Sequence, residues 1–383
     1  MATWEELEKA GTTWADLSGV TWAELEETCE KGSSNIAQKD LEDRDGEYPI
    51  YGASGFIKNV DFYQQETPYI AVVKDGAGVG RVMRLPAKSS VIGTMQYILP
   101  KNNVDTGYLA YALEHMNLSK YYTGATIPHI YFKDYKKEKF PLPPLDEQRR
   151  IAAVLDKVSG LIAKRREQLD KLDELVKARF LEMFGDPVSN PKGWNNGTIR
   201  DVVSEVKYGT SRPAVDGGTY KYLRMGNITF DGHLDLSDLK YIDIPDSELE
   251  KCMVRKGDVL FNRTNSKELV GKTCVFDLDE PMVIAGYIIR VRVNKKVLPI
   301  YLSAVLNSQY GKQILADMCK AIVGQANINA QELQDIAILI PPIELQEKFS
   351  DYAETIKKSK LTIQQSLDKL EVLKKALMQQ YFG

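Results

Sequence analysis

The chain has 383 residues, of which 43% are hydrophobic and 27% charged, and a formal net charge of -3 at pH 7. This length and composition fit a globular protein with two or three hydrophobic cores and exclude a disordered or fibrous chain. The sequence shows no basic region followed by an apolar run at its start and no apolar stretch of about 18 residues, so we expect a cytoplasmic protein without a membrane span.

The first residues are acidic and repetitive. The strings TWEEL, TWADL and TWAEL begin at Thr3, Thr13 and Thr21. Residues 1–45 hold 12 Asp and Glu against 4 Lys and Arg, so the rest of the chain holds 46 basic against 41 acidic residues. The net charge therefore neither excludes nor proves a nucleic-acid partner. We expect residues 1–21 to form an acidic, Trp-containing extension whose role stays unassigned.

Two blocks of roughly 140 residues have the pattern of mixed α/β domains. Apolar stretches such as YIAVV, QYILP, KYLRM, DVLFN and YIIRV are separated by Gly, Asn and Asp, which is typical of short strands joined by turns. Each block also contains a helical string, GYLAYALEHM or IYLSAVLNSQYGKQIL. We expect the first globule to span residues 22–142 and the second to span residues 186–340.

A repeat follows each block. Residues 143–185 align without a gap on residues 341–383 at a constant offset of 198, and both copies open on Pro-Pro and close on Phe-Gly. Neither copy has a proline after the opening pair, so each is predicted to be a helix of about 38 residues and about 57 Å. The turn-rich residues 186–194 must end the first helix.

The second copy has an apolar residue every seven positions, which predicts a coiled-coil seam. In the first copy two arginines, Arg165 and Arg179, interrupt the same register. The alternative is a pair of unrelated amphipathic surface helices. The seam residues are Phe349, Ile356, Ile363, Leu370 and Leu377.

From about Trp22 onward, the chain resembles the specificity subunit of Type I restriction-modification systems. The strings that carry the resemblance in the first globule are YPIYGASGFI, KDGAGVGR, VIGTMQYILP and GATIPHIYFKDYKKEKFPLPPLDEQ. Those in the second are KYGTSRPAVDGG, YLRMGNIT, GDVLFNRTNSKELVGKT and INAQELQDIAILIPPIELQ, and the linker FGDPVSNPKGW resembles the family too. The first 21 residues depart from the family pattern.

The resemblance implies an α+β protein with two target-recognition domains in tandem, each followed by a long helix. The helices would pack as an antiparallel coiled coil with pseudo-twofold symmetry. Such a subunit is not catalytic and needs no cofactor. It would read an asymmetric bipartite site on double-stranded DNA, dock two methyltransferase subunits and, through the assembled complex, join restriction subunits.

Polar residues near the ends of apolar stretches are the candidate DNA contacts. Arg263 follows such a stretch, and arginine can bond guanine bidentately while asparagine can bond adenine. For each candidate the alternative is a solvated loop or a structural turn. The candidates in the first globule are Tyr51, Ser54, Lys74, Arg81, Thr94, Gln96, Thr126 and His129; those in the second are Tyr208, Thr210, Ser211, Arg212, Arg224, Asn227, Asn262, Arg263, Thr264, Asn265, Ser266 and Lys272.

Two other functions compete with DNA recognition. The glycine-rich residues 72–80 superficially resemble the cofactor loop of an S-adenosylmethionine-dependent DNA methyltransferase, but such a loop should open a helix, whereas residues 81–86 read as a strand closed by proline. A structural coiled-coil adaptor would explain the helices and leave both globules without a role. The scattered cysteines and histidines suggest neither a metal site nor disulfides.

Overall fold

The computed structural model describes residues 20–383 except 125–127, 267 and 320–325. The chain divides into two compact units. Unit 1 comprises residues 1–167 and 364–383, and unit 2 comprises residues 168–363. Two helices of 40 residues each, α6 (Leu145–Phe184) and α11 (Ile343–Phe382), contribute to both units. No helix in the described part of the chain is long and apolar enough to cross a membrane.

Unit 1 is built on a four-stranded antiparallel sheet in the order β2-β8-β5-β6, beside a three-stranded sheet β4-β3-β7 and a pair β1-β9. All five residues of the central strand β5 are buried. Its elements are β1 (Thr21–Glu24), α3 (Leu25–Thr28), β2 (Cys29–Ser33), η1 (Gln38–Leu41), β3 (Tyr48–Gly52), β4 (Gly55–Val60), β5 (Tyr69–Val73), β6 (Val82–Leu85), β7 (Ser90–Val91), β8 (Met95–Pro100), α4 (Thr106–Met116), η2 (Leu118–Tyr121), α5 (Phe132–Tyr135) and β9 (Lys139–Leu142).

Unit 2 has sheets in the orders β11-β19-β15-β17 and β13-β12-β18-β14, and the pairs β10-β21 and β16-β20. Its first elements are β10 (Asn195–Thr198), η3 (Ile199–Val202), β11 (Val203–Tyr208), β12 (Tyr220–Leu223), η4 (Met225–Asn227), β13 (Lys240–Ile242), α7 (Asp246–Cys252), β14 (Met253–Val254) and β15 (Val259–Asn262). The others are β16 (Thr264–Asn265), β17 (Thr273–Val275), β18 (Met282–Ile284), β19 (Ile288–Val293), α8 (Pro299–Asn307), α9 (Gln309–Met318), β20 (Ala326–Asn327), α10 (Ala330–Gln334) and β21 (Ala337–Ile340).

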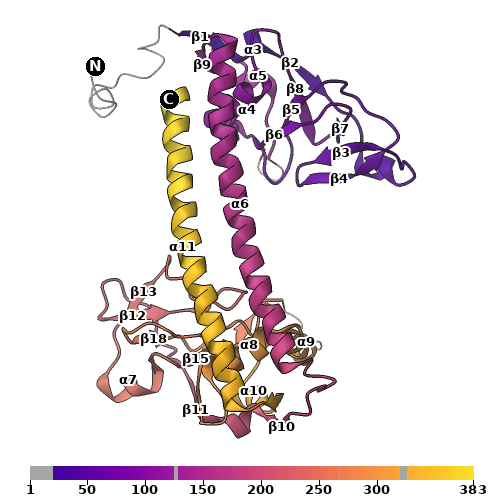
Figure 1. The fold of residues 1–383 in the computed structure, drawn as a ribbon. Helices are drawn as coiled ribbons and strands as arrows, with labels where there is room; N and C mark the ends of the chain where they lie inside the picture. The colour runs from indigo at the N-terminus through magenta and orange to yellow at the C-terminus, as the bar shows by residue number, and fades with distance from the viewer. Residues whose placement is uncertain (1–19, 125–127, 267, 320–325) are drawn as a thin grey trace. The chain divides into compact units, whose positions relative to one another are not determined.

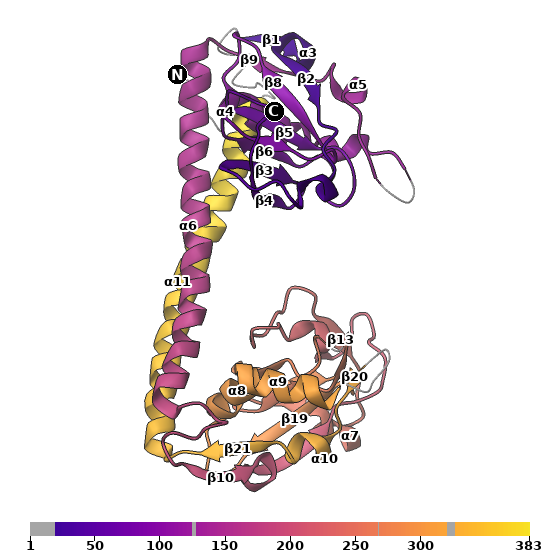
Figure 2. The same cartoon turned by 90° about the vertical axis from the view of Figure 1, so that its right-hand side faces the viewer.

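The two globules share one topology. Each four-stranded sheet pairs its strands in the same sequence, with β5 and β15 at equivalent inner positions. Each smaller sheet contains one parallel pair, β3 with β7 in unit 1 and β12 with β18 in unit 2. A two-stranded pair joins the start of each globule to the strand before its long helix. The expected tandem of two mixed α/β globules, each followed by a long helix, is confirmed (Figure 2).

The helices run antiparallel. In unit 1, Arg166 of α6 donates to Glu371 of α11 at 2.6 Å, and in unit 2 Asp173 of α6 accepts from Lys360 of α11 at 2.6 Å. As the residue number rises along α6, that of its partner falls along α11, which confirms the antiparallel pair. The seam side chains are less buried than the heptad pattern suggested, because Ile356, Ile363, Leu370 and Leu377 are only half-buried.

A buried glutamine anchors the start of each helix. The Gln148 side chain accepts from the Asp105 N–H at 2.8 Å and donates to the carbonyls of Asn103 and Pro143 at 3.1 and 2.8 Å. Gln346, 198 residues later, repeats this pattern: it accepts from Leu298 at 2.8 Å and donates to Lys296 and Pro341 at 3.1 and 2.9 Å. The sequence repeat therefore continues as a repeat of tertiary hydrogen bonds.

The third T-W string belongs to the folded part of unit 1. Thr21 begins β1, which pairs with β9, and both Ala23 and Leu25 are buried. Thr21, which we expected to end the extension, is therefore part of the first globule. The first two strings, TWEEL and TWADL, lie outside the described residues.

Candidate nucleic-acid interface

In each unit, one loop follows an inner strand of the four-stranded sheet, and the same two backbone hydrogen bonds join the ends of that loop. In loop A, residues 74–80, the N–H of Val73 donates to Arg81 at 2.9 Å and that of Gly80 donates to Val73 at 2.8 Å. In loop B, residues 263–271, the N–H of Asn262 donates to Lys272 and that of Gly271 donates to Asn262, both at 2.8 Å. The two loops are therefore equivalent, although loop B is two residues longer.

Both loops end on a glycine that no other residue could replace without strain. Gly80 has φ +86°, and a Cβ there would lie 2.5 Å from the backbone nitrogen of Ser119. Gly271 has φ +78°, and a Cβ would lie 2.5 Å from Leu315. Because positive φ and close approach both favour glycine, each loop is held tightly against the helical element behind it.

The first residue of each loop is basic and its backbone is fixed on both sides. The N–H of Lys74 donates to Thr94 at 3.0 Å, and its carbonyl accepts from Ile130 at 2.9 Å. The N–H of Arg263 donates to Tyr287 at 2.9 Å, and its carbonyl accepts from Ile328 at 2.8 Å. Lys74 and Arg263 thus hold the same position in the two globules.

Arg263 lies in a cleft of about 410 Å³ that Tyr208, Thr210 and Ser211 also line. Its guanidinium carbon lies 4.8 Å from the centre of the Tyr208 ring, a cation–π arrangement. The Tyr208 hydroxyl accepts from the Ala330 N–H at 2.8 Å, which holds the ring in place. Four of the expected contacts are therefore brought together around one cleft.

An ion pair lies beside this cleft. Arg212 donates to Glu248 at 2.6 and 3.1 Å, and both side chains are exposed. The hydrogen bonds from Arg212 lower the pKa of the Glu248 carboxyl. A phosphate approaching Arg212 would compete with Glu248 for its guanidinium.

Several expected contacts in unit 2 are buried and support the loops instead. Asn227, Asn262, Thr264 and Lys272 are each less than a tenth exposed. The Asn262 amide donates to the Met225 carbonyl at 3.3 Å, and the Lys272 ammonium donates to the same carbonyl at 2.8 Å. Thr264 donates to Asn327 at 3.0 Å, and burial lowers the pKa of Lys272. In this structure these side chains position loop B and do not face solvent.

The remaining candidates of unit 2 lie at its surface or near it. Arg224 donates to the Asp238 carboxylate at 2.6 Å, and the side chain of Asn227 accepts from the backbone N–H of Arg224 at 2.8 Å. The Asn265 side chain accepts from the N–H of Ser266 at 2.8 Å, and Ser266 is exposed. Arg224 is thus tied into its own turn, whereas Asn265 and Ser266 lie on loop B.

In unit 1 most of the expected contacts gather around loop A. Arg81 donates to the Ala53 carbonyl at 2.9 Å, which ties the turn carrying the exposed Ser54 to this loop. Asp75 forms an isolated β-bridge with His129, so His129 lies next to Lys74. Tyr51 packs edge-on against the exposed Phe56, with ring centres 6.0 Å apart.

Two expected contacts of unit 1 are turned inward. Gln96 is 1% exposed and its amide donates to the buried Tyr135 hydroxyl. Thr94 is partly buried, and its hydroxyl has no hydrogen-bond partner among the described residues. Thr126 lies outside the described residues.

Sequence reasoning missed the exposed aromatic residues beside the loops. Phe56, Tyr131 and Tyr287 are each at least half exposed; Tyr131 packs edge-on against His129 at 5.5 Å, and Tyr287 accepts the backbone bond from Arg263. Each of the three has an apolar neighbour, Ile57, Ile130 or Ile288, so the local sequence carried no signal of their exposure. Exposed aromatic side chains offer apolar contact to bases or sugars.

The glycine-rich loop A has the wrong context for a cofactor loop. It leads from β5 into β6, an antiparallel neighbour, and not into a helix. A nucleotide-type loop uses the N–H groups of a following helix to hold an anion. The strand predicted after residue 80 is confirmed.

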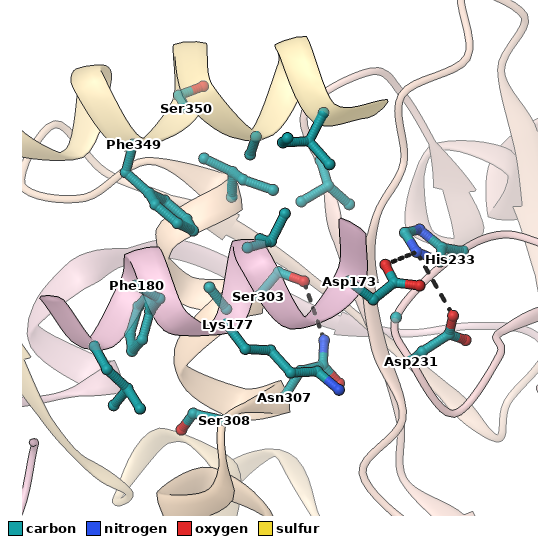
Figure 3. Close-up of a pocket in the computed structure, with 18 of the residues that line it drawn as sticks. Asp173, Lys177, Phe180, Asp231, His233, Ser303, Asn307, Ser308, Phe349 and Ser350 are labelled. Atoms are coloured by element: carbon teal, nitrogen blue, oxygen red, sulfur yellow. Dashed lines mark hydrogen bonds and ion pairs between the residues drawn. The ribbon is translucent and has the colours of Figure 1, made fainter. Parts of the chain in front are cut away.

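A larger cleft of about 1280 Å³ lies in unit 2 between the long helices and α8 and α9. Phe180 and Phe349 contribute to its apolar wall, while Asp173, Asp231 and His233 point toward one another at one side (Figure 3). The Lys360 ammonium lies 2.6 Å from Asp173 and 3.1 Å from His233. This ammonium is the positive charge that pairs with the Asp173 carboxylate, and Asp231 lies 3.7 Å from His233.

The family model described as the Type I restriction modification DNA specificity domain matches residues 18–173 and 191–373. The chain is 24% identical to the Type I restriction enzyme EcoKI specificity subunit of Escherichia coli over 74% of this chain and 67% of that protein. It is 25% identical to the Type I restriction enzyme MjaVIII specificity subunit of Methanocaldococcus jannaschii over 88% of this chain and 85% of that protein.

The fold also matches solved structures. The crystal structure of a Type I restriction-modification S subunit from M. genitalium superposes with a TM-score of 0.61 and 15% identity, covering 95% of this chain and 96% of that one. A chain from a study of complex assembly and conformational transition of the type I R-M system gives a TM-score of 0.51 and 18% identity, covering 94% of this chain and 96% of that one. These structures confirm the architecture.

Proposed function

Because the chain belongs to the Type I restriction-modification DNA specificity family, we propose that it reads an asymmetric, bipartite site on double-stranded DNA. Each unit reads one half of the site. The two globules carry different side chains on their equivalent loops, so we expect two different half-sites and a site without the palindromic symmetry expected of a homodimeric reader.

The observation that carries the proposal is the equivalence of loops A and B. The same backbone hydrogen bonds hold both loops, yet their sequences, KDGAGVG and RTNSKELVG, differ in length and in side chains. A constant frame that presents variable polar side chains is what base recognition requires, because bases are distinguished by donors and acceptors at their edges.

The chain acts as a recognition subunit and leaves methyl transfer and cleavage to its partners, two methyltransferase subunits and the restriction subunits. The surface of the long helices supports docking of other subunits. Leu361 and Val372 of α11 are 62% and 69% exposed, and Leu175 and Leu181 of α6 are about half exposed. Apolar side chains in such number on paired helices favour coverage by another protein.

The test is a duplex-binding and methylation assay on the full chain, alone and with its methyltransferase partner. The complex is expected to bind one class of duplex and to methylate it in the presence of labelled S-adenosylmethionine. The chain alone is expected to transfer no methyl group. Methyl transfer by the chain alone, or equal binding of the complex to all duplexes, would overturn the proposal.

A further inference from the structure

Lys74 and Arg263 occupy equivalent positions in the two units, as the first residues of loops A and B. The backbone N–H of each donates to the residue that precedes the neighbouring strand of the sheet, Thr94 before β8 or Tyr287 before β19. The backbone carbonyl of each accepts from the N–H of an isoleucine, Ile130 or Ile328. The backbone at both positions is therefore fixed from two sides. The side chain is the part that differs between the two units.

Among the described residues of unit 2, Arg263 is the one arginine without an acidic partner. Within the described residues, Arg179, Arg200, Arg212, Arg224, Arg255, Arg290 and Arg292 all pair with carboxylates. Arg263 contacts the Tyr208 ring instead. Its positive charge is thus left available to a ligand in the cleft.

The orientation of Arg263 leaves one end of its guanidinium for that ligand. Its Nε is buried and has no hydrogen-bond partner in the described part of the chain, so the terminal nitrogens are the donors that a ligand can reach. Two parallel N–H donors match the O6 and N7 acceptors of guanine. The stack on Tyr208 orients the side chain in advance, which reduces the entropy lost on binding.

Lys74 offers a donor of the same charge but another shape. Its ammonium lies 3.5 Å from Asp75 of the same loop and is partly exposed. A lysine can also bond the two acceptors of guanine, although as a flexible point charge. Both loops therefore begin with a side chain suited to the same base.

We propose that Lys74 and Arg263 are equivalent specificity-determining residues, each of which reads a guanine in its own half-site. This inference rests on the proposed function and adds the base and the position that reads it. It predicts that changes at the two residues affect separate halves of the DNA site.

The experiment compares methylation of a library of duplexes by the full complex carrying wild-type chain, Arg263→Ala, Arg263→Gln or Lys74→Ala. Arg263→Ala should reduce discrimination at one base pair of one half-site by about 10- to 100-fold. Arg263→Gln should shift that position from guanine toward adenine, because glutamine bonds the N6 and N7 of adenine. Lys74→Ala should act only on the other half-site.

Arg200→Ala is the matched control, since Arg200 pairs with Asp335 and lies outside loop B. It should leave the site unchanged, and thermal unfolding of every variant checks that it folds. If Arg263→Ala fails to fold, Arg263→Gln and Lys74→Ala still decide the matter. Unchanged base preference in folded variants, or an equal loss on all sequences, would overturn the inference while the proposed function stands; wild-type complex without any bipartite preference would overturn the proposed function itself.

Discussion

Phe184 and Phe382, which are 198 residues apart in the sequence, hold equivalent places in the two units. The Phe184 ring centre lies 4.9 Å from that of Tyr301, and the Phe382 ring centre lies 5.0 Å from that of Tyr108. Each tyrosine donates its hydroxyl to a carbonyl two residues before the Pro-Pro pair, Tyr301 to Leu339 at 2.8 Å and Tyr108 to Pro141 at 2.7 Å. The end of each helix thus completes the core of one globule.

Phe382→Ala should destabilise unit 1, and Phe184→Ala should destabilise unit 2. Both rings are buried, and removing such a ring costs about 3–5 kcal/mol. Hydrogen exchange read by mass spectrometry locates the effect, because faster exchange is expected in α4 for the first variant and in α8 for the second. The exposed Leu361→Ala serves as the control. Equal loss of protection in both units from either variant would contradict the assignment of each ring to one core.

Gln148→Ala and Gln346→Ala should each destabilise the chain by about 1–3 kcal/mol, because buried backbone groups lose their partners. The control is Gln364→Ala, whose side chain bonds Asp368 on an exposed face. Its effect should stay within about 0.5 kcal/mol. Thermal unfolding measures all three. A Gln148 or Gln346 variant as stable as the control would mean that these hydrogen bonds do not anchor the helices.

Lys312 makes the stability of unit 2 depend on pH. Burial lowers its pKa from the ordinary 10.5 to about 8, with smaller effects from Lys272 and Lys177. Between pH 8 and 10.5 the unfolded chain binds a proton that the folded chain does not, so the contribution of Lys312 becomes more favourable as pH rises. Below pH 8 both states are protonated and the full cost of burying the charge remains.

Lys312→Met should therefore stabilise the protein near pH 7 by on the order of 1 kcal/mol, a value reduced for partial solvent access. The difference from wild type should vanish above pH 10.5. Urea unfolding at pH 7, 9 and 10.5 measures it, with the exposed Lys358→Met as the control. A difference that stays constant over this range would show that Lys312 is not held in a desolvated site.

The sequence predicted two equivalent long helices because the repeat keeps one offset, 198, from the Pro-Pro pair to the Phe-Gly end, whereas their antiparallel pairing was expected only from the family resemblance. It could not reveal that loops A and B are equivalent. Lys74 and Arg263 are 189 residues apart, whereas Gly80 and Gly271 are 191 apart, so insertions and deletions hide the correspondence. Only the shared backbone hydrogen bonds bring it out.

Polar residue type alone also could not separate side chains that face solvent from those that support a loop. Asn262, Lys272 and Gln96 belong to strings that read as loop ends, yet all three are buried. Their partners, Met225 and Tyr135, lie far away in the sequence. Such long-range hydrogen bonds follow from the tertiary structure and have no local signal.

One heptad added to each long helix at matching positions should lengthen each by about 10 Å, at 1.5 Å per residue. We expect both half-site sequences to survive and the unspecified spacer between them to grow by about 3 base pairs, at 3.4 Å per pair. Sequencing of methylated bases in cells with the lengthened chain tests this expectation. Altered half-sites with an unchanged spacer would show that the lengths of the two helices do not set the distance between the half-sites.

The most direct test is the identity of the DNA site itself. Methylated bases are mapped across the genome of cells that contain the wild-type chain and its methyltransferase partner, with cells lacking the chain as the control. We expect methylation at one site made of two different short sequences separated by a fixed number of unspecified base pairs. A palindromic site, a single continuous sequence, or the same methylation without the chain would contradict it.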